Sequence, residues 1–222
     1  MIRNIIISQS KYKAKFKKLV HLFIFINLIS VAFPNEKIPK TVFILVDGVP
    51  LERLKDIYTP NIDKIINEGS FSKAFVGGEK NGISESPTVS AVGYMSLLTG
   101  TWANKHNVWN NYFINPDRQY WDIFKLAKSQ SKKIETALFS TWTDNRTKLI
   151  GNKITDTEET KLDYYFDGFE LDLKKFPHDS EKNYIRKIDD LISHEAARYL
   201  LQHGPDLSWV YLEHTDAIGH KY

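Results

Sequence analysis

Residues 41–48 read Thr-Val-Phe-Ile-Leu-Val-Asp-Gly, a continuous run of apolar and β-branched side chains that ends at an acidic residue and a glycine. Such a run is typical of a strand that is buried on both faces of a parallel sheet. Residues 207–212 read Leu-Ser-Trp-Val-Tyr-Leu and end in a similar way, at Glu213. The two runs therefore predict two buried strands that are far apart in the chain.

Helices and strands alternate between these two runs. Apolar residues at helical spacing predict helices over residues 62–68, 91–98, 120–129 and 184–203. Further strands are expected over residues 70–76 and 134–140. The polar segment 143–180 is expected to be an insertion or lid outside the core. The alternation predicts an α/β fold, with a mostly parallel sheet flanked by helices.

The N-terminal segment has the pattern of a signal peptide. Residues 1–32 contain six basic residues and no acidic residue, and an apolar run covers residues 19–33. The small residues Ser30 and Ala32 fit cleavage near residue 32, so the protein is expected to be secreted or periplasmic. The alternative is an uncleaved membrane anchor. It is disfavoured because a span needs about 20 apolar residues, and this run is shorter and includes a histidine and an asparagine.

The composition is that of one folded domain: 222 residues, of which 42% are hydrophobic and 26% charged. The formal charge of +3 depends on the N-terminal segment, whose removal takes away six of the 30 basic residues and changes the charge to −3. No surface for binding nucleic acid is therefore expected, and no membrane span is expected after cleavage. The absence of cysteine excludes disulfides, a thiolate nucleophile and zinc thiolates.

Ligands bind parallel sheets beyond the carboxyl ends of the strands, so acidic residues and histidines at these places are candidates for chemistry. Asp47 follows the first strand, and Asp216 and His220 follow the last. The Asp-x-x-x-His spacing puts a carboxylate and an imidazole one helical turn apart, where both can reach one cation. The alternatives are an ordinary Asp-Gly turn and a solvent-facing pair on a helix.

Ser90 begins the short apolar helix expected near residues 91–98. It could cap the helix by accepting a hydrogen bond from one of the first free amides. The same place also suits a bound phosphate, because the amides and the positive end of the helix dipole point toward it. The sequence leaves both roles open.

Five segments occur in the order of a known family: residues 46–48, 59–63, 90–100, 106–111 and 211–220. Together they resemble the type I phosphodiesterases and nucleotide pyrophosphatases of the alkaline phosphatase superfamily, which implies an alkaline-phosphatase-like sandwich. In that family the nucleophile lies nine residues before the Thr of a closing Thr-Gly, which gives Ser90 here, with Thr88 as the second candidate. The Cys/Ser-x-Pro-x-Arg signature of sulfatases is missing, so a sulfatase is disfavoured.

The resemblance implies hydrolysis of phosphate diesters or nucleotide pyrophosphate bonds through a phosphoserine at Ser90. Two divalent metal ions would assist this reaction. Zinc is the metal that best suits a mixture of nitrogen and oxygen ligands. The substrates would be small phosphoesters or nucleotides. By this resemblance, Asp47 and Ser90 would bind the first metal ion. Asp216 and His220 would bind the second, and Asn111 and Ala91 would contact the phosphate.

The sequence departs from the family pattern at two places. Asn107 replaces a usual glycine, which is a mild change because asparagine tolerates a left-handed backbone. The family's later Asp-His pair and final histidine are not among the 222 residues. We therefore expect residues 33–222 to be part of a catalytic domain that is inactive as it stands. The alternatives are a non-catalytic metal- or phosphate-binding remnant, a phosphomonoesterase of the same superfamily, and an α/β domain without a metal site.

Overall fold

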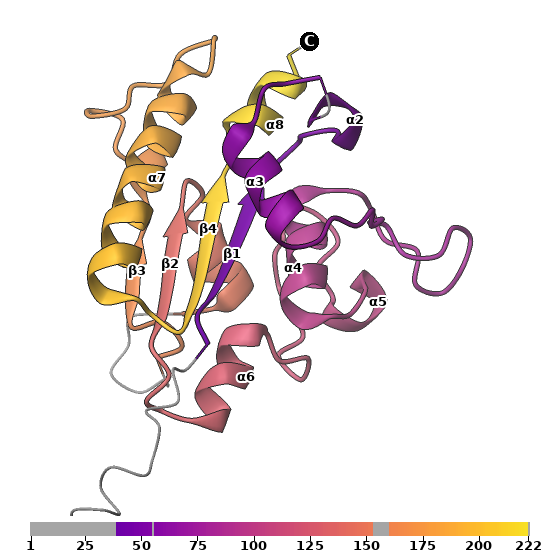
Figure 1. Ribbon diagram of the computed structural model, residues 1–222. Coiled ribbons are helices and arrows are strands. Elements are labelled where there is room, and N and C mark those ends of the chain that lie inside the picture. The colour runs from indigo at the N-terminus through magenta and orange to yellow at the C-terminus, as the bar shows by residue number, and fades with distance from the viewer. Residues whose placement is uncertain (1–38, 55, 153–159, 222) are drawn as a thin grey trace, which may run out of the picture. The chain divides into compact units, whose positions relative to one another are not determined.

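The computed structural model describes residues 39–54, 56–152 and 160–221. The expected signal peptide lies outside these residues. Residues 40–222 form one compact unit, in which strands and helices alternate as expected for an α/β fold (Figure 1). The elements are β1 (Thr41–Val46), α2 (Leu51–Leu54), α3 (Pro60–Glu68), α4 (Ser90–Thr99), α5 (Ala103–His106), α6 (Ile123–Gln130), β2 (Thr136–Ser140), the π-helix η1 (Asn145–Ile150), β3 (Tyr164–Phe166), the 3-10 helix η2 (Phe169–Leu171), α7 (Asn183–His203), β4 (Leu207–Leu212) and α8 (His214–Gly219).

The four strands form one sheet in the order β1-β4-β2-β3, and every neighbouring pair is parallel. Thr41 pairs with Leu207 and Val46 with Leu212, so β1 and β4 end at the same level. The first and last strands of the described chain are thus neighbours, and the residues that follow them meet at one edge of the sheet. This confirms the α/β class and the parallel sheet.

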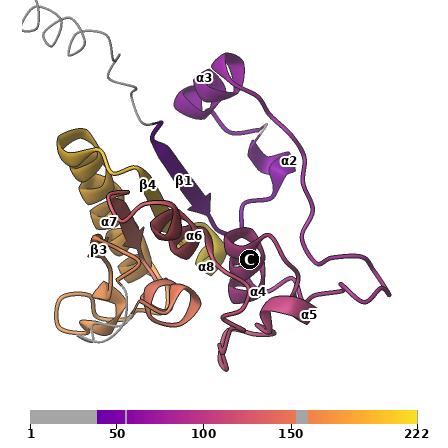
Figure 2. The same cartoon turned by 90° about the horizontal axis from the view of Figure 1, so that it is seen from below.

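Helices cover both faces of the sheet. Ala137, Phe139 and Val210 pack against α7 on one face, whereas Leu138, Trp209 and other residues of the larger core pack against α4 and η1 on the opposite face. Figure 1 shows α7 on one side of the strands and α4 on the other, and Figure 2 gives the same arrangement from below. Successive residues of a strand point to opposite faces, which is why β2 supplies both cores.

The expectation that residues 41–46 are buried on both faces is wrong. Phe43 and Leu45 pack into the larger core, but Val42, Ile44 and Val46 are 42%, 57% and 44% exposed. The reason is the position of β1 at the edge of the sheet, where α7 does not cover its second face. The apolar run in β4 has the central position and is buried over Leu207–Tyr211, as expected.

The strand expected over residues 70–76 is not formed, and these residues adopt no regular structure. Phe71, Phe75 and Val76 gave the segment its strand-like composition, yet all three are exposed. A strand needs a hydrogen-bonding neighbour, and within the described residues the edge of the sheet is β1, which pairs with β4 alone.

The described residues of segment 143–180 contribute to the sheet and the core, contrary to the expectation of an insertion or lid outside the core. β3 extends the sheet by pairing with β2, and Leu149, Ile150 and Leu162 are completely or almost completely buried in the larger core. Several of its described polar residues hydrogen-bond with one another, as Arg146 does with Asp167, or with a strand end, as the Lys161 carbonyl does with Thr136 of β2.

The expected helices are confirmed, with shifted ends for several of them. The helix expected over residues 120–129 begins at Ile123, because the Asp122 side chain accepts a hydrogen bond from Lys125 N and caps it. The helix expected from residue 91 begins at Ser90 and ends before Gly100, which has a left-handed backbone. Among the described residues, no helix has both the length and the hydrophobicity needed to cross a membrane.

Candidate active site

Ser90 is the first residue of α4, and its hydroxyl points toward Asp47 rather than along the helix. The N-cap position belongs to Val89, and no side chain caps this helix end. The capping role considered for Ser90 is therefore wrong. Ser90 Oγ instead donates a hydrogen bond of 3.3 Å to Asp47 Oδ2. The serine hydroxyl thus lies beside a carboxylate at the positive end of a ten-residue helix.

Asp47 is held at the end of β1 by its backbone and by its side chain. Its amide donates to Leu212 O at 3.0 Å, which continues the pairing of β1 with β4. The buried phenols of Tyr94 and Tyr211 both donate to Asp47 Oδ2, the latter at 3.3 Å. Burial, reinforced by nearby negative charge, raises the pKa of both phenols, so both stay protonated as donors.

Asn111 is brought to α4 by the loop that follows α5. Its Oδ1 accepts a hydrogen bond of 2.8 Å from the Ala91 amide. In this arrangement the Ala91 amide orients Asn111, which keeps its two Nδ2 protons for another acceptor. Asn107, at the start of this loop, has a left-handed backbone with φ of 60°. Its substitution for glycine is therefore accommodated as expected.

His106 fixes this loop to α4 and is completely buried. Its Nδ1 accepts the Val108 amide at 3.1 Å, and its Nε2 lies 3.0 Å from Ser96 Oγ. Because Nδ1 is an acceptor, the ring is neutral and carries its proton on Nε2. Burial lowers the pKa of His106 to about 4, so the ring is neutral at physiological pH.

Asp216 reaches the same place from β4, through α8. Gly48, directly after Asp47, has φ of +68°, and a Cβ on it would lie 2.4 Å from Asp216 Cα. Only glycine permits this approach of the segments that follow β1 and β4. His220 Nε2 lies 3.5 Å from Asp216 Oδ1, but the His220 side chain is 81% exposed.

The start of α8 is anchored by Asp189 of α7. The Asp189 carboxylate accepts hydrogen bonds from the Glu213 amide at 3.1 Å and from the His214 amide at 2.8 Å. Thr141, after β2, donates to the same carboxylate through its hydroxyl. Burial, with the Asp189 charge second, raises the pKa of Glu213 to about 7.

The candidate residues meet at one cavity beyond the carboxyl ends of β1 and β4. A cavity of about 700 Å³ is lined, among others, by Asp47, Ser90, Asn111, Asp216 and His220. Thr88, the second candidate nucleophile, lines it as well, but no hydrogen bond joins its hydroxyl to Asp47 among the described residues. An adjoining cavity of about 430 Å³ shares Asp47, Ser90, Asn111 and Asp216 and continues toward Trp142, Asp144 and Lys148.

The candidate metal ligands suit divalent zinc in type and in spacing. Zinc binds oxygen and nitrogen ligands at about 2.0–2.2 Å in tetrahedral geometry, so two of its ligand atoms lie about 3.3–3.5 Å apart. The Asp47–Ser90 and Asp216–His220 pairs are separated by 3.3 and 3.5 Å. Within the described residues, however, no group of three or more acidic or histidine side chains could hold one metal ion. Each pair could supply two ligands, one fewer than the three protein ligands that catalytic zinc usually has.

Sequence reasoning missed four residues of this site: Tyr94, Tyr211, Asp144 and Lys148. The signal for Tyr94 was its place one helical turn after Ser90, on the same face of α4. The signal for Asp144 and Lys148 was their position after the carboxyl end of β2, the same rule that selected Asp47. It was overlooked because the whole polar segment was assigned to a lid.

Comparison with known protein families identifies the family of this chain. The sequence profile of the family described as Type I phosphodiesterase / nucleotide pyrophosphatase matches residues 41–222, which include every described strand and helix. No match was found among curated proteins or among solved structures. Since the profile covers far more than half of the chain, the protein belongs to the type I phosphodiesterase/nucleotide pyrophosphatase family, a family of phosphoric ester hydrolases.

Proposed function

We propose that the protein hydrolyses phosphate diesters or nucleotide pyrophosphate bonds through a phosphoserine formed at Ser90. The observation that carries this proposal is the contact of 3.3 Å between Ser90 Oγ and Asp47 Oδ2 at the start of α4. It supports a nucleophile because the hydroxyl faces a cavity that Asn111, Asp216 and His220 also line. Family membership supports the same class of reaction.

The side chains of this chain have separable tasks in the reaction. Ser90 releases its proton to water and its oxygen attacks phosphorus, while the bond from phosphorus to the leaving oxygen breaks and the leaving group departs with the electron pair of that bond. Asn111 Nδ2 and the positive end of α4 stabilise the non-bridging oxygens. The phosphoserine still carries the second substituent of the substrate, and water then cleaves it, which releases a phosphate monoester or a nucleoside monophosphate and returns a proton to Ser90.

Two divalent cations, which we propose to be zinc, would be held by Asp47 with Ser90 and by Asp216 with His220. When bound, they lower the pKa of the serine hydroxyl and offset the negative charge of the leaving oxygen. Catalytic zinc usually has three protein ligands, and each pair supplies two. We therefore expect weak zinc binding and no meaningful turnover by the 222-residue chain at ordinary zinc concentrations, so the assays use zinc in excess.

The proposal is tested by the hydrolysis of bis(p-nitrophenyl) phosphate with excess zinc. Ser90→Ala is expected to lower kcat/KM at least about 1,000-fold, because no other group replaces a nucleophile. Thr88→Ala is the matched control, since it removes a hydroxyl that lines the same cavity, and it should stay within about threefold of the parent. Equal activity of Ser90→Ala and the parent would refute the assignment, and a selective loss in Thr88→Ala would transfer the role to Thr88.

We also propose that residues 1–32 are a signal peptide and that the mature hydrolase domain is exported. The basic and apolar segments of this region support the proposal. Expression in a bacterial host followed by mass measurement of the periplasmic protein tests it. Cleavage near residue 32 is expected, whereas full-length protein in the membrane fraction would favour the uncleaved anchor.

A further inference from the structure

The cavity beside Ser90 contains one fixed positive charge among its described lining residues, the ammonium of Lys148. Four acidic side chains line the same cavity, and those that are ionised would repel a phosphate. They belong to Asp47, Asp144, Glu213 and Asp216. Among the described residues that line this cavity, Lys148 is therefore the one cation that can offset the charge of a bound phosphate.

Lys148 is partly oriented by Asp144. Its Nζ lies 2.7 Å from Asp144 Oδ2, with the two residues four positions apart. The Lys148 side chain is 44% exposed and that of Asp144 is 18% exposed, so the pair lies at the opening of the cavity. An ammonium group has three protons to donate. Asp144 uses one of them, which leaves two for a ligand.

The backbone under Lys148 is held by Arg118. The Arg118 guanidinium donates to the carbonyl oxygens of Lys148 at 2.6 Å, Leu149 at 2.5 Å and Ile150 at 3.0 Å. Gly151 follows with φ of +71°, and a Cβ on it would lie 2.5 Å from Arg118 Nη2. The glycine is therefore required for this contact. The three carbonyls belong to η1, a π-helical turn, and such turns are frequent at functional sites.

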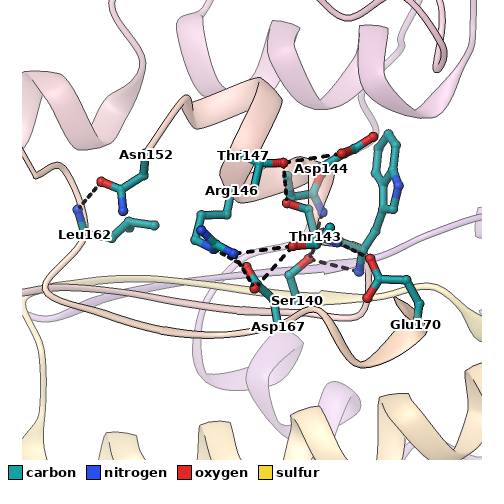
Figure 3. A network of polar contacts seen from close by, with 11 residues as sticks. Ser140, Thr143, Asp144, Arg146, Thr147, Asn152, Leu162, Asp167 and Glu170 are labelled. Carbon is teal, nitrogen blue, oxygen red and sulfur yellow. Dashed lines mark hydrogen bonds and ion pairs between the residues drawn. The ribbon is translucent and has the colours of Figure 1, made fainter. Parts of the chain in front are cut away.

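A network of buried polar contacts fixes the other end of the same turn (Figure 3). Arg146 makes two hydrogen bonds to the Asp167 carboxylate, at 2.7 and 2.9 Å, and these two side chains are 12% and 2% exposed. Thr147 Oγ1 donates to the second oxygen of Asp144 at 3.3 Å. The Asp144 carboxylate thus accepts hydrogen bonds from both Thr147 and Lys148, which fixes the orientation of the Asp144–Lys148 pair.

We propose that Lys148 binds a non-bridging oxygen of the substrate phosphate, and that a phosphate group with two negative charges, as in a phosphomonoester, gains more binding free energy from this contact than the singly charged phosphate of a diester. This inference rests on the proposed reaction at Ser90. A phosphomonoester has a second pKa of about 6 and carries nearly two charges above neutral pH, whereas a diester carries one. The additional charge strengthens the hydrogen bond to the ammonium. Asn111 Nδ2 supplies a neutral donor from the loop that follows α5.

The test compares Lys148→Ala and Lys148→Arg with the parent chain on p-nitrophenyl phosphate and bis(p-nitrophenyl) phosphate at excess zinc. Lys148→Ala should lower kcat/KM for the monoester about ten- to hundred-fold. The loss for the diester should stay below about threefold, and Lys148→Arg should retain most monoester activity. Lys125→Ala, which removes a lysine from a different cavity, is the matched control and should change neither value. Equal losses on both esters, or no loss on either, would overturn the proposal.

A binding measurement separates this inference from the proposed reaction. Calorimetric titration of the zinc-loaded parent with inorganic phosphate and with dimethyl phosphate needs no turnover. Lys148→Ala should raise the dissociation constant of phosphate about ten- to hundred-fold and leave that of dimethyl phosphate nearly unchanged. If the parent hydrolyses neither ester, the proposed function fails, and this titration still decides the role of Lys148. A parent that binds no phosphate, or a variant that binds it equally well, contradicts the role.

Discussion

The two halves of the candidate site are held in different ways. In the serine half, Asp47 Oδ2 receives hydrogen bonds from Ser90 and from two buried tyrosines. In the half on α8, His220 contacts Asp216 at 3.5 Å but is 81% exposed, and the helix is anchored mainly through its first amides, on Asp189. The first half is therefore preorganised, whereas the second depends on the placement of a short helix.

After the loss of Ser90 itself, the largest expected effect distinguishes Asp47 in the serine half from Asp216 in the half on α8. Asp47→Asn should lower hydrolysis at least about 100-fold even at saturating zinc, because it removes a charge beside the nucleophile. Asp216→Asn should be partly rescued by higher zinc concentration, because its half binds the ion more loosely. Zinc titrations of activity for both variants provide the measurement. If excess zinc rescues Asp47→Asn as well as Asp216→Asn, the proposed difference between the halves does not exist.

A smaller effect is expected at Asp189, which acts only through α8. Asp189→Asn keeps the shape of the side chain but weakens its acceptance of the Glu213 and His214 amides, so α8 should be less well placed. Zinc affinity should fall about ten-fold, as is usual for groups that orient a ligand. Equilibrium dialysis measures this directly. Asp190→Asn, which changes an exposed neighbour on α7, is the control. Unchanged zinc affinity in Asp189→Asn would show that α8 needs no such anchor.

The smallest effect concerns the pH dependence of the serine half. The unfolded chain protonates His106 below about pH 6.5, whereas burial lowers its pKa in the folded protein to about 4. The neutral ring therefore contributes its full stability above about pH 6.5, and this contribution is lost as the pH falls toward 4. His106→Gln should flatten the dependence of Tm on pH across this window. His194→Gln, at an exposed site, should leave the dependence as steep as in the parent.

Much of the fold follows from local pattern, and the failures come from tertiary position. β4 and β1 have similar apolar runs, but only β4 has a strand on each side and cover on both faces. The composition of a segment indicates that it can form a buried strand. It does not indicate whether another element covers that strand in the fold. The strand prediction for residues 70–76 was wrong for a related reason. Three large apolar side chains favour a strand there, but these residues do not pair with any strand of the described sheet.

The site was predictable where a motif follows a strand, and less so where contacts are long-range. Asp47, Ser90 and Asp216 were found from their places after strands or before a helix. Tyr94 and Tyr211 are 117 residues apart, and their shared contact with Asp47 depends on the sheet order. Lys148 was hidden in a polar segment whose buried ion pairs resemble surface charge when only the sequence is considered.

The most direct test of the central claim is to identify the residue that carries the phosphate. The zinc-loaded chain is mixed with substrate and quenched in acid, and its peptides are analysed by mass spectrometry. We predict phosphate on Ser90, in lower amount in Asp47→Asn and absent in Ser90→Ala. Phosphate on Thr88, or turnover that leaves no phosphorylated residue at any time after mixing, would contradict the account.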